Sequence, residues 1–166
     1  MKKVLIVIDS CKKPECDKLG VCLKESFEKM HWMAEMIDLQ PGVFEYTYFH
    51  SMIKFKPDFL VTLNLAGFTM KTDAEETSLN RIPCRMAHLM LHSYEGYEEV
   101  LKHTINFSMY FFTGLKETAL QMQTNFPHIE HISCLEELIT LQKNKPEKCS
   151  LQADVIVEKI LHITEF

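Results

Sequence analysis

Residues 54–64 have the sequence KFKPDFLVTLN, and this stretch decides the expected fold. Pro57 is expected to end a preceding helix, because a residue before proline avoids the helical region of backbone conformation. The apolar run 59–63 follows and stops at the amide side chain of Asn64. A short, mostly apolar segment with such boundaries is typical of a strand buried on both faces of a parallel sheet.

Similar apolar runs on either side predict further strands, at 3–8, 32–37, 85–91, 106–112 and, as a short strand, within 127–133. Between them, apolar residues recur at helical spacing. The expected helices are 15–30 (striped by Leu19, Leu23, Phe27 and Met30), about 45–55, one marked by Tyr94, Tyr97 and Leu101, one marked by Leu115, Ala119, Met122 and Phe126, 136–142, and a terminal helix at about 150–165. The long loop after Asn64 is expected to hold a helical turn near 73–79.

This alternation of strand and helix is the signature of an α/β protein. We expect a three-layer, Rossmann-like or flavodoxin-like open parallel sheet with helices on both faces. Right-handed crossovers leave few topologies, and the predicted strand order is 2-1-3-4-5, extended by a sixth strand where 127–133 forms one. The chain of 166 residues shows no internal boundary, so residues 1–166 are expected to be a single domain.

Composition and charge exclude several classes of protein. The net charge of -5 gives no support for binding nucleic acid or anionic lipid. The longest apolar runs are too short to span a bilayer, and the run before Asp9 is too short for a signal peptide. The six cysteines include no CxxC pair, and the spacing of Cys11, Cys16 and Cys22 fits no standard zinc arrangement. We therefore expect a cytoplasmic protein with reduced thiols, no bound metal and no membrane span.

The strand order also predicts where a ligand would bind. In open α/β sheets, ligands bind beyond the carboxyl ends of the strands, at the point where the crossovers change face. For this order that point lies between the first and third strands. The residues expected there are Asp9, Ser10, Asn64, Gly67, His92, Ser93, Thr113 and Gly114.

Two of these residues are candidates for catalysis. His92 could titrate near neutral pH as a general base, and Asp9 could act as a base or instead cap the following turn. His88 lies four residues before His92. On a strand the two are about 13 Å apart, too far to share a metal ion, so His88 is expected in the core.

The small residues in the set have two interpretations each. Asn64 and Gly67 either let a ligand approach the backbone or simply form the turn after the strand. Thr113 and Gly114 either offer an anion-binding helix start or provide an ordinary helix cap.

Several nucleotide and nucleophile motifs do not occur. There is no GxGxxG after the first strand, no GxxxxGK[ST] and no GxSxG, which argues against a dinucleotide enzyme, a P-loop protein and an α/β-hydrolase. No cofactor is therefore predicted. The loop DSCKKPEC is a poor flavodoxin phosphate loop, and Asn64 stands where a response-regulator receiver would carry its phosphoacceptor aspartate.

The runs KPDFLVTLNLAGF, RIPCRMAHLML and FSMYFFTGLKETALQMQTNFPHIEHI together resemble the N-terminal half of GT-B glycosyltransferases, closest to the group with a spore-maturation-type N-terminal domain. The resemblance covers roughly residues 3–135. It implies a Rossmann-like, acceptor-side domain with a nucleotide-sugar or glycan-type ligand. In that family the sugar nucleotide binds mainly the C-terminal domain, so a missing C-terminal domain or a partner protein is implied. The family's acidic position after the fourth strand is His92 here.

The first functional interpretation is a stand-alone relative of that domain, binding a small molecule or a partner protein at the strand ends and not catalytically complete alone. A second is a receiver-like or flavodoxin-like signalling module that works by protein contact. A third is a small independent enzyme with His92 or Asp9 as its base.

Overall fold

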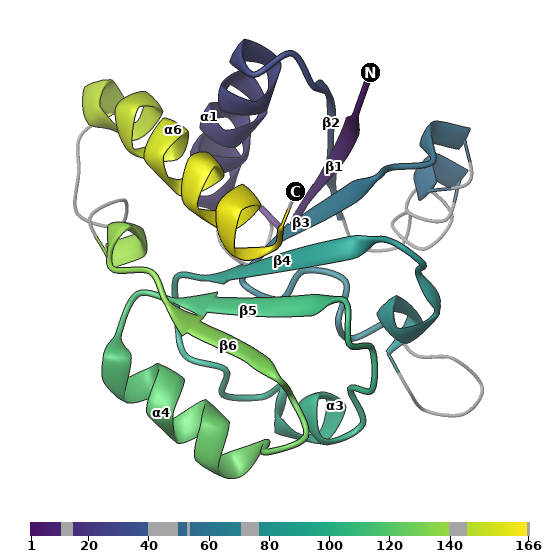
Figure 1. Cartoon of the computed structure of the whole chain (residues 1–166), viewed down its shortest axis with the longest axis vertical. Helices are drawn as coiled ribbons and strands as arrows, with labels where there is room; N and C mark the ends of the chain where they lie inside the picture. Colours follow the sequence, from purple (N-terminus) through teal and green to yellow (C-terminus); the bar gives the residue numbers. More distant parts are fainter. Residues whose placement is uncertain (11–14, 40–49, 53, 71–76, 140–145, 166) are drawn as a thin grey trace.

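The structure is a computed structural model that describes residues 1–10, 15–39, 50–52, 54–70, 77–139 and 146–165. Its strands form one six-stranded, fully parallel sheet of order β2-β1-β3-β4-β5-β6 (Figure 1). The strands are β1 (Lys3–Ile8), β2 (Met33–Asp38), β3 (Phe59–Leu63), β4 (Arg85–Met90), β5 (Met109–Thr113) and β6 (His131–Cys134). This confirms the predicted fold class, the strand order and the sixth strand.

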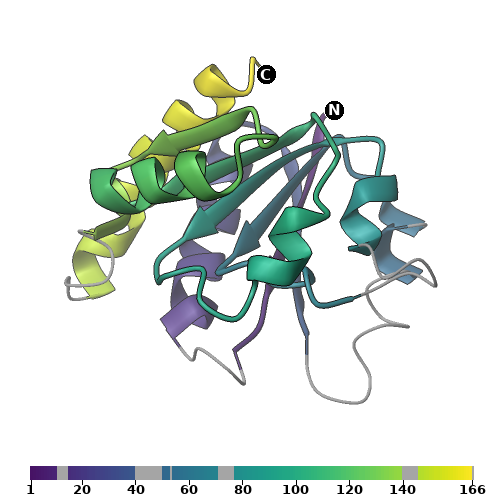
Figure 2. The same cartoon turned by 90° about the horizontal axis from the view of Figure 1, so that it is seen from below.

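Helices cover both faces of the sheet, as Figures 1 and 2 show. Helices α1 and α6 pack on one face, and α3 and α4 pack on the other. The helical elements are α1 (Glu15–Lys29), the 3-10 helix η1 (Ser78–Arg81), α3 (Glu98–Lys102), α4 (Lys116–Asn125) and α6 (Pro146–Ile163). Within the described residues, no helix is long and apolar enough to cross a membrane.

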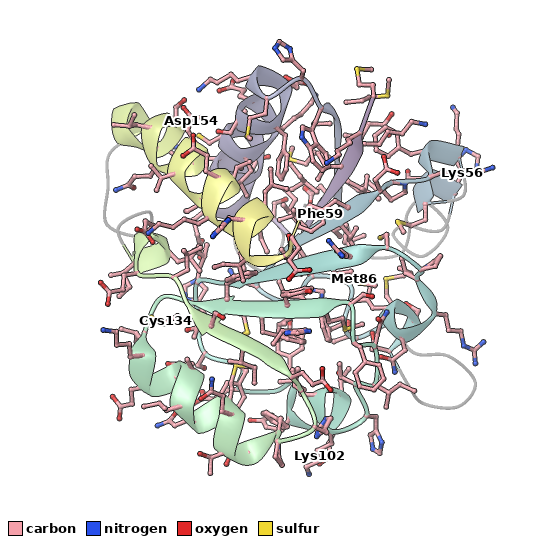
Figure 3. All side chains as sticks on the ribbon, viewed as in Figure 1. Lys56, Phe59, Met86, Lys102, Cys134 and Asp154 are labelled. Atoms are coloured by element: carbon pink, nitrogen blue, oxygen red, sulfur yellow. The ribbon has the colours of Figure 1, made fainter. Side chains whose placement is uncertain are left out.

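The central strands are mostly apolar because both of their faces are buried, and Thr62 and His88 are the buried polar exceptions in β3 and β4. Successive residues of a strand point to opposite faces, so each strand contributes to two cores. In β1, Val4, Ile6 and Ile8 pack with α1 and α6, whereas Leu5 and Val7 pack on the other face. Figure 3 labels Phe59 and Met86, which belong to these two separate cores.

The predicted apolar stripe of α1 holds for three of its four residues. Leu19, Leu23 and Phe27 are buried, whereas Met30 is 41% exposed. The helix ends at Lys29, and the chain turns at His31 with a φ of 62°. Met30 therefore lies after the last helical turn and does not continue the stripe.

Three strands differ in their bounds from the prediction. The strand expected at 106–112 is β5, which begins at Met109 because Asn106 forms a turn first: its side chain accepts from Ser108 N–H at 2.9 Å. The strand expected within 127–133 is β6, which begins at His131 after a turn in which Ile129 N–H donates to Phe126. The second strand is shifted by one residue to Met33–Asp38, because the Trp32 N–H donates to the Phe27 carbonyl of α1 at 3.0 Å.

The fourth strand and the helix after it also differ from the prediction. The fourth strand ends at Met90, one residue earlier than expected, because the Leu91 N–H donates to the Asn64 side chain and not to a neighbouring strand. Tyr94 and Tyr97 form a turn, with Gly96 at a φ of 86°, so only Leu101 of that predicted helix lies in α3.

Parts of three predicted helical segments lie outside the described residues. Of the helix expected at about 45–55, residues 50–52 and 54–55 are described and are helical. Of 136–142, residues 137–139 are helical. The helical turn expected near 73–79 falls mostly on 71–76, and the described part leads into η1.

Candidate ligand-binding site

A cavity lies beyond the carboxyl ends of β1, β3 and β4, with a volume of about 240 Å³. We call it the β1–β3 cavity, since β1 and β3 are the strands between which the crossovers change face. Its lining residues are Asp9, Cys16, Leu63, Asn64, His92, Ser93, Glu95 and Tyr97. The structure thus brings together four of the eight residues expected at the strand ends, namely Asp9, Asn64, His92 and Ser93.

Asn64 connects three segments at this edge of the sheet. Its side-chain oxygen accepts hydrogen bonds from the main-chain N–H groups of Leu91 and His92, at 2.7 and 3.2 Å. Its amide nitrogen donates to the Cys16 sulfur at 3.2 Å, in the first turn of α1. Its φ is 50°, a left-handed conformation that asparagine tolerates better than most residues. Asn64 therefore holds the ends of β3 and β4 and the start of α1 in fixed relation.

His92 contacts a carboxylate that the sequence analysis did not single out. Its Nε2 lies 2.7 Å from Oε1 of Glu15, the first residue of α1. A carboxylate can only accept, so Nε2 of His92 is the donor in this hydrogen bond. The two side chains are 38% and 48% exposed, so the pair adds little to stability. Its main effect is to orient the imidazole.

Ser10 forms structural hydrogen bonds with Asp38 and is not among the residues that line the cavity. Its N–H donates to Oδ1 of Asp38 at 2.9 Å, and its hydroxyl donates to the other carboxylate oxygen. Asp38 is the last residue of β2. The pair fixes Ser10, just after β1, to the end of the neighbouring strand.

Gly67 lines a second, smaller cavity of about 50 Å³, which shares Asp9 and Tyr97 with the first. This volume suits one or two water molecules rather than an organic ligand. Gly67 has a φ of 86°, and Leu65 has a φ of 58° despite its branched side chain. The positive φ is unstrained for glycine but strained for Leu65, and backbone strain persists only where surrounding contacts enforce it. Leu65 is 2% exposed, so burial of its side chain supplies those contacts.

Thr113 and Gly114 line neither of these two cavities. Thr113 is the buried last residue of β5, and α4 begins at Lys116 with Leu115 as its N-cap and no side-chain cap. The N-cap of α4 is therefore Leu115 and not Thr113, although the Thr113 hydroxyl accepts the Leu115 N–H at 3.5 Å. A Cβ on Gly114 would lie 2.7 Å from Cγ1 of Ile139, which explains the glycine by close packing.

His88 is a core residue, as expected. It is fully buried between Phe68 and Phe111, with ring centroids 4.7 and 4.8 Å away, and its Nδ1 shares a hydrogen bond of 2.8 Å with the Thr62 hydroxyl. Its Nε2 has no hydrogen-bond partner in the described part of the chain. Burial lowers the pKa of His88 to about 3, so the ring is neutral at physiological pH.

The charges around the β1–β3 cavity are mostly negative. Asp9 and Glu95 line it, and Glu15 lies at its edge through His92. Its lining contains no lysine or arginine among the described residues. Carboxylate oxygens accept hydrogen bonds, so this lining suits a ligand that donates them, such as a polyol. Phosphate groups would meet like charge here.

Sequence reasoning missed Glu15, Cys16, Glu95 and Tyr97. Glu15 and Cys16 open the first helix after β1, which is a signal for proximity to the strand ends. Tyr97 was assigned to an apolar helix stripe, and only the turn at Gly96 directs it to the cavity.

Across the described ranges, no three histidine, cysteine or acidic side chains group in a way that could hold a metal ion. The five described cysteines, Cys16, Cys22, Cys84, Cys134 and Cys149, have free thiols.

Comparison with models of protein families and with curated proteins finds no match to this chain.

Proposed function

We propose that the protein binds a small, hydroxyl-rich molecule of glycan type in the β1–β3 cavity. The observation that carries the proposal is the position and lining of this cavity at the point where the crossovers change face. A cavity at this place, with polar side chains converging on it from separate elements, is the usual form of a ligand site in α/β proteins.

Size and charge favour a single sugar ring over a complete nucleotide sugar. The volume of about 240 Å³ is below the range of about 300–1,000 Å³ common for drug-sized ligands. Asp9 and Glu95 would accept hydrogen bonds from sugar hydroxyls and repel a diphosphate. Tyr97 adds an aromatic surface on which the apolar face of a sugar ring can pack.

The resemblance to the acceptor-side half of GT-B glycosyltransferases agrees with this ligand class. In that family the sugar nucleotide binds mainly the other domain. We therefore propose that this chain supplies a glycan-binding half, and that group transfer would need a partner protein or a further domain.

Thermal unfolding with a ligand panel tests the proposal. The panel contains monosaccharides, short oligosaccharides, nucleotides and nucleotide sugars, and a ligand that binds only the folded state raises the unfolding temperature with concentration. We expect a saturable rise with at least one sugar, and a smaller or absent rise with nucleotides. No rise with any sugar in the panel would contradict the proposal.

Matched variants locate the binding. Asp9→Asn and Glu95→Gln change cavity carboxylates with little change in shape, and each should weaken sugar binding measured by calorimetry. Glu117→Gln, on the exposed first turn of α4, is the control and should bind as the unmodified protein does. Equal affinity in all three variants would place the ligand elsewhere.

A second candidate function is favoured by the Glu15–His92 pair. A carboxylate that orients an imidazole beside a cavity is an arrangement typical of general-base catalysis. In this case the protein would be a small independent enzyme in which Nδ1 of His92 takes the proton.

Turnover of activated esters and glycosides, followed by product release, tests this second candidate. His92→Ala should remove any turnover that is found, and Glu15→Gln should reduce it by about ten- to a hundredfold, since the ring loses its orientation. His103→Ala, which alters a histidine at the end of α3, is the control. Unchanged turnover in His92→Ala would exclude His92 as the base.

A further inference from the structure

Two cysteine thiols meet where α1 and α6 pack together. Cys22 of α1 and Cys149 in the first turn of α6 share a side-chain hydrogen bond. Both are half-buried and pack against the same core, on the face of the sheet opposite α3 and α4. The two side chains therefore face each other across the α1–α6 interface although the residues are far apart in the sequence.

A polar network fixes the helices in this register. Ser26, one turn after Cys22, donates its hydroxyl to Asp154 at 2.6 Å. Lys29, a further turn along, donates to Asp154 at 2.9 Å and to Ser150 at 3.2 Å. Figure 3 labels Asp154 on α6. These contacts keep the first turns of α6 against α1, so the thiols stay adjacent.

Buried packing supports the same register. Ala153 and Val157 of α6 and Leu23 of α1 are fully buried in the core beneath the network. The small side chain of Ala153 lets the two helices approach closely. Close approach of the helix backbones is what a disulfide requires, since its Cα atoms lie about 4.4–6.8 Å apart.

We propose that Cys22 and Cys149 are a redox-active pair that forms a reversible disulfide between α1 and α6 on exposure to a low-molecular-weight disulfide of the glutathione class. The other described cysteines have different surroundings. Cys84 lies beside Asp58, and Cys134 donates to the Gly114 carbonyl. The inference is independent of the β1–β3 cavity, because Cys22 lies about two helical turns beyond the cavity residue Cys16.

The reaction takes two exchange steps. The Cys149 thiol attacks the external disulfide, forming a mixed disulfide and releasing one external thiol. The Cys22 thiol then attacks the Cys149 sulfur, which forms the protein disulfide and releases the second external thiol. Two protein thiols are oxidised, one external disulfide is reduced to two thiols, and each departing thiolate takes up the proton of the attacking group.

The second step should be the slow one. Burial, and then the Cys149 contact, raise the pKa of Cys22 to about 12, so very little of it is thiolate at neutral pH. The rate of ring closure should therefore rise about tenfold for each unit of pH between pH 7 and 9.

Peptide mapping of the full chain provides the test. The protein is equilibrated in buffers of reduced and oxidised glutathione, its remaining thiols are alkylated, and it is digested with trypsin. Cleavage after lysine places Cys22 in peptide 19–24 and Cys149 in peptide 149–159, each with a single cysteine. We expect these two peptides to be joined in the oxidising buffers and separate after reduction. Absence of the joined peptide, or preferred linkage of other cysteines, would overturn the proposal.

Variants and stability give further readouts. In Cys22→Ser, Cys149 should stop at the mixed disulfide with glutathione, whereas in Cys149→Ser, Cys22 should remain a thiol. Cys134→Ser is the matched control and should cross-link as the unmodified protein does. Because the bond closes a long loop, oxidation should raise the unfolding temperature by about 10 °C. An unchanged or lower unfolding temperature would show that the native helices do not accommodate the bond.

Discussion

The side-chain oxygen of Asn64 accepts the main-chain N–H of His92 at 3.2 Å, together with that of Leu91 at 2.7 Å. The residue that ends β3 thus fixes the backbone of the residue whose imidazole borders the β1–β3 cavity. A receiver domain would carry a phosphoacceptor at the end of this strand. Here the side chain is engaged in hydrogen bonds that shape the edge of the sheet.

Two substitutions of Asn64 separate its side-chain contacts from its backbone conformation. Asn64→Gly removes the hydrogen bonds but tolerates the φ of 50°, and should lower the free energy of unfolding by about 2 kcal/mol. Asn64→Ala also places a Cβ in the left-handed region, which adds about 1 kcal/mol. Urea unfolding measures both. Equal stability of the two variants would mean that the positive φ carries no strain.

The free energy of unfolding should depend on pH because the pKa of His88 differs between the folded and unfolded states. Burial lowers its pKa from 6.5 to about 3 in the folded state, so between these values the unfolded chain binds the extra proton. The contribution of His88 is therefore fully present above pH 6.5 and is lost as the pH falls toward 3. Urea unfolding should show about 2 kcal/mol lower stability at pH 5 than at pH 7 from this residue.

Two core variants test whether His88 is the residue that causes this pH dependence of stability. His88→Leu removes the titrating ring and its unpartnered Nε2, so its stability should change about 2 kcal/mol less than wild type between pH 7 and 5. Leu101→Ala also destabilises the core, by about 2–5 kcal/mol, but keeps His88 and should keep the full pH dependence. The same pH dependence in His88→Leu as in wild type would refute the assignment.

Gly114 and Gly20 should respond differently to alanine. At Gly114 the added Cβ would lie 2.7 Å from Cγ1 and 3.1 Å from the backbone nitrogen of Ile139, so Gly114→Ala should cost about 1–3 kcal/mol. At Gly20 the nearest atoms are both in side chains, Sδ of Met36 at 2.6 Å and Cγ2 of Ile8 at 3.1 Å, and alanine favours the helix by about 1 kcal/mol. Gly20→Ala should therefore stay within about 1 kcal/mol of wild type in urea unfolding. A neutral Gly114→Ala would contradict the close-packing explanation.

Ser26 and Asp154 should be energetically coupled across α1 and α6. The Ser26 hydrogen bond, followed by that of Lys29, holds the pKa of Asp154 below its ordinary value of 3.8. Ser26→Ala and Asp154→Ala should each cost about 1 kcal/mol, and the double variant should cost about 0.5–1 kcal/mol less than their sum. Glu28→Ala, in the exposed pair with Lys24, is the control and should change stability by less than about 0.5 kcal/mol.

The same carboxyl gives a second pH signature. Because its folded pKa is lowered, its stabilising contribution is present above pH 3.8 and is lost as the pH falls through the folded value. Ser26→Ala should weaken this acid-range dependence, which acid-induced unfolding measures. Additive effects of Ser26→Ala and Asp154→Ala at neutral pH would show that the hydrogen bond contributes no stability.

Much of the fold follows from local patterns in the chain. The runs KVLIVI and FLVTL are apolar at every position except Lys3 and Thr62, and few structures other than a buried parallel strand can accommodate such runs. Their alternation with helical stripes predicted the three layers and the strand order. The ends of elements were harder to predict, because side chains such as Asn106 and Asn64 compete with the sheet for backbone hydrogen bonds.

The sequence alone therefore determined that this protein is a parallel α/β fold, and at which edge of the sheet its polar side chains gather. Only the tertiary structure decided which of them meet. The Glu15 carboxylate hydrogen-bonds to His92, and Ser10 hydrogen-bonds to Asp38 instead of lining the cavity. Gly114 packs so closely against Ile139 that a larger residue would clash. Such pairings depend on distances of a few ångströms between segments far apart in the chain, and hydrophobic periodicity contains no information about them.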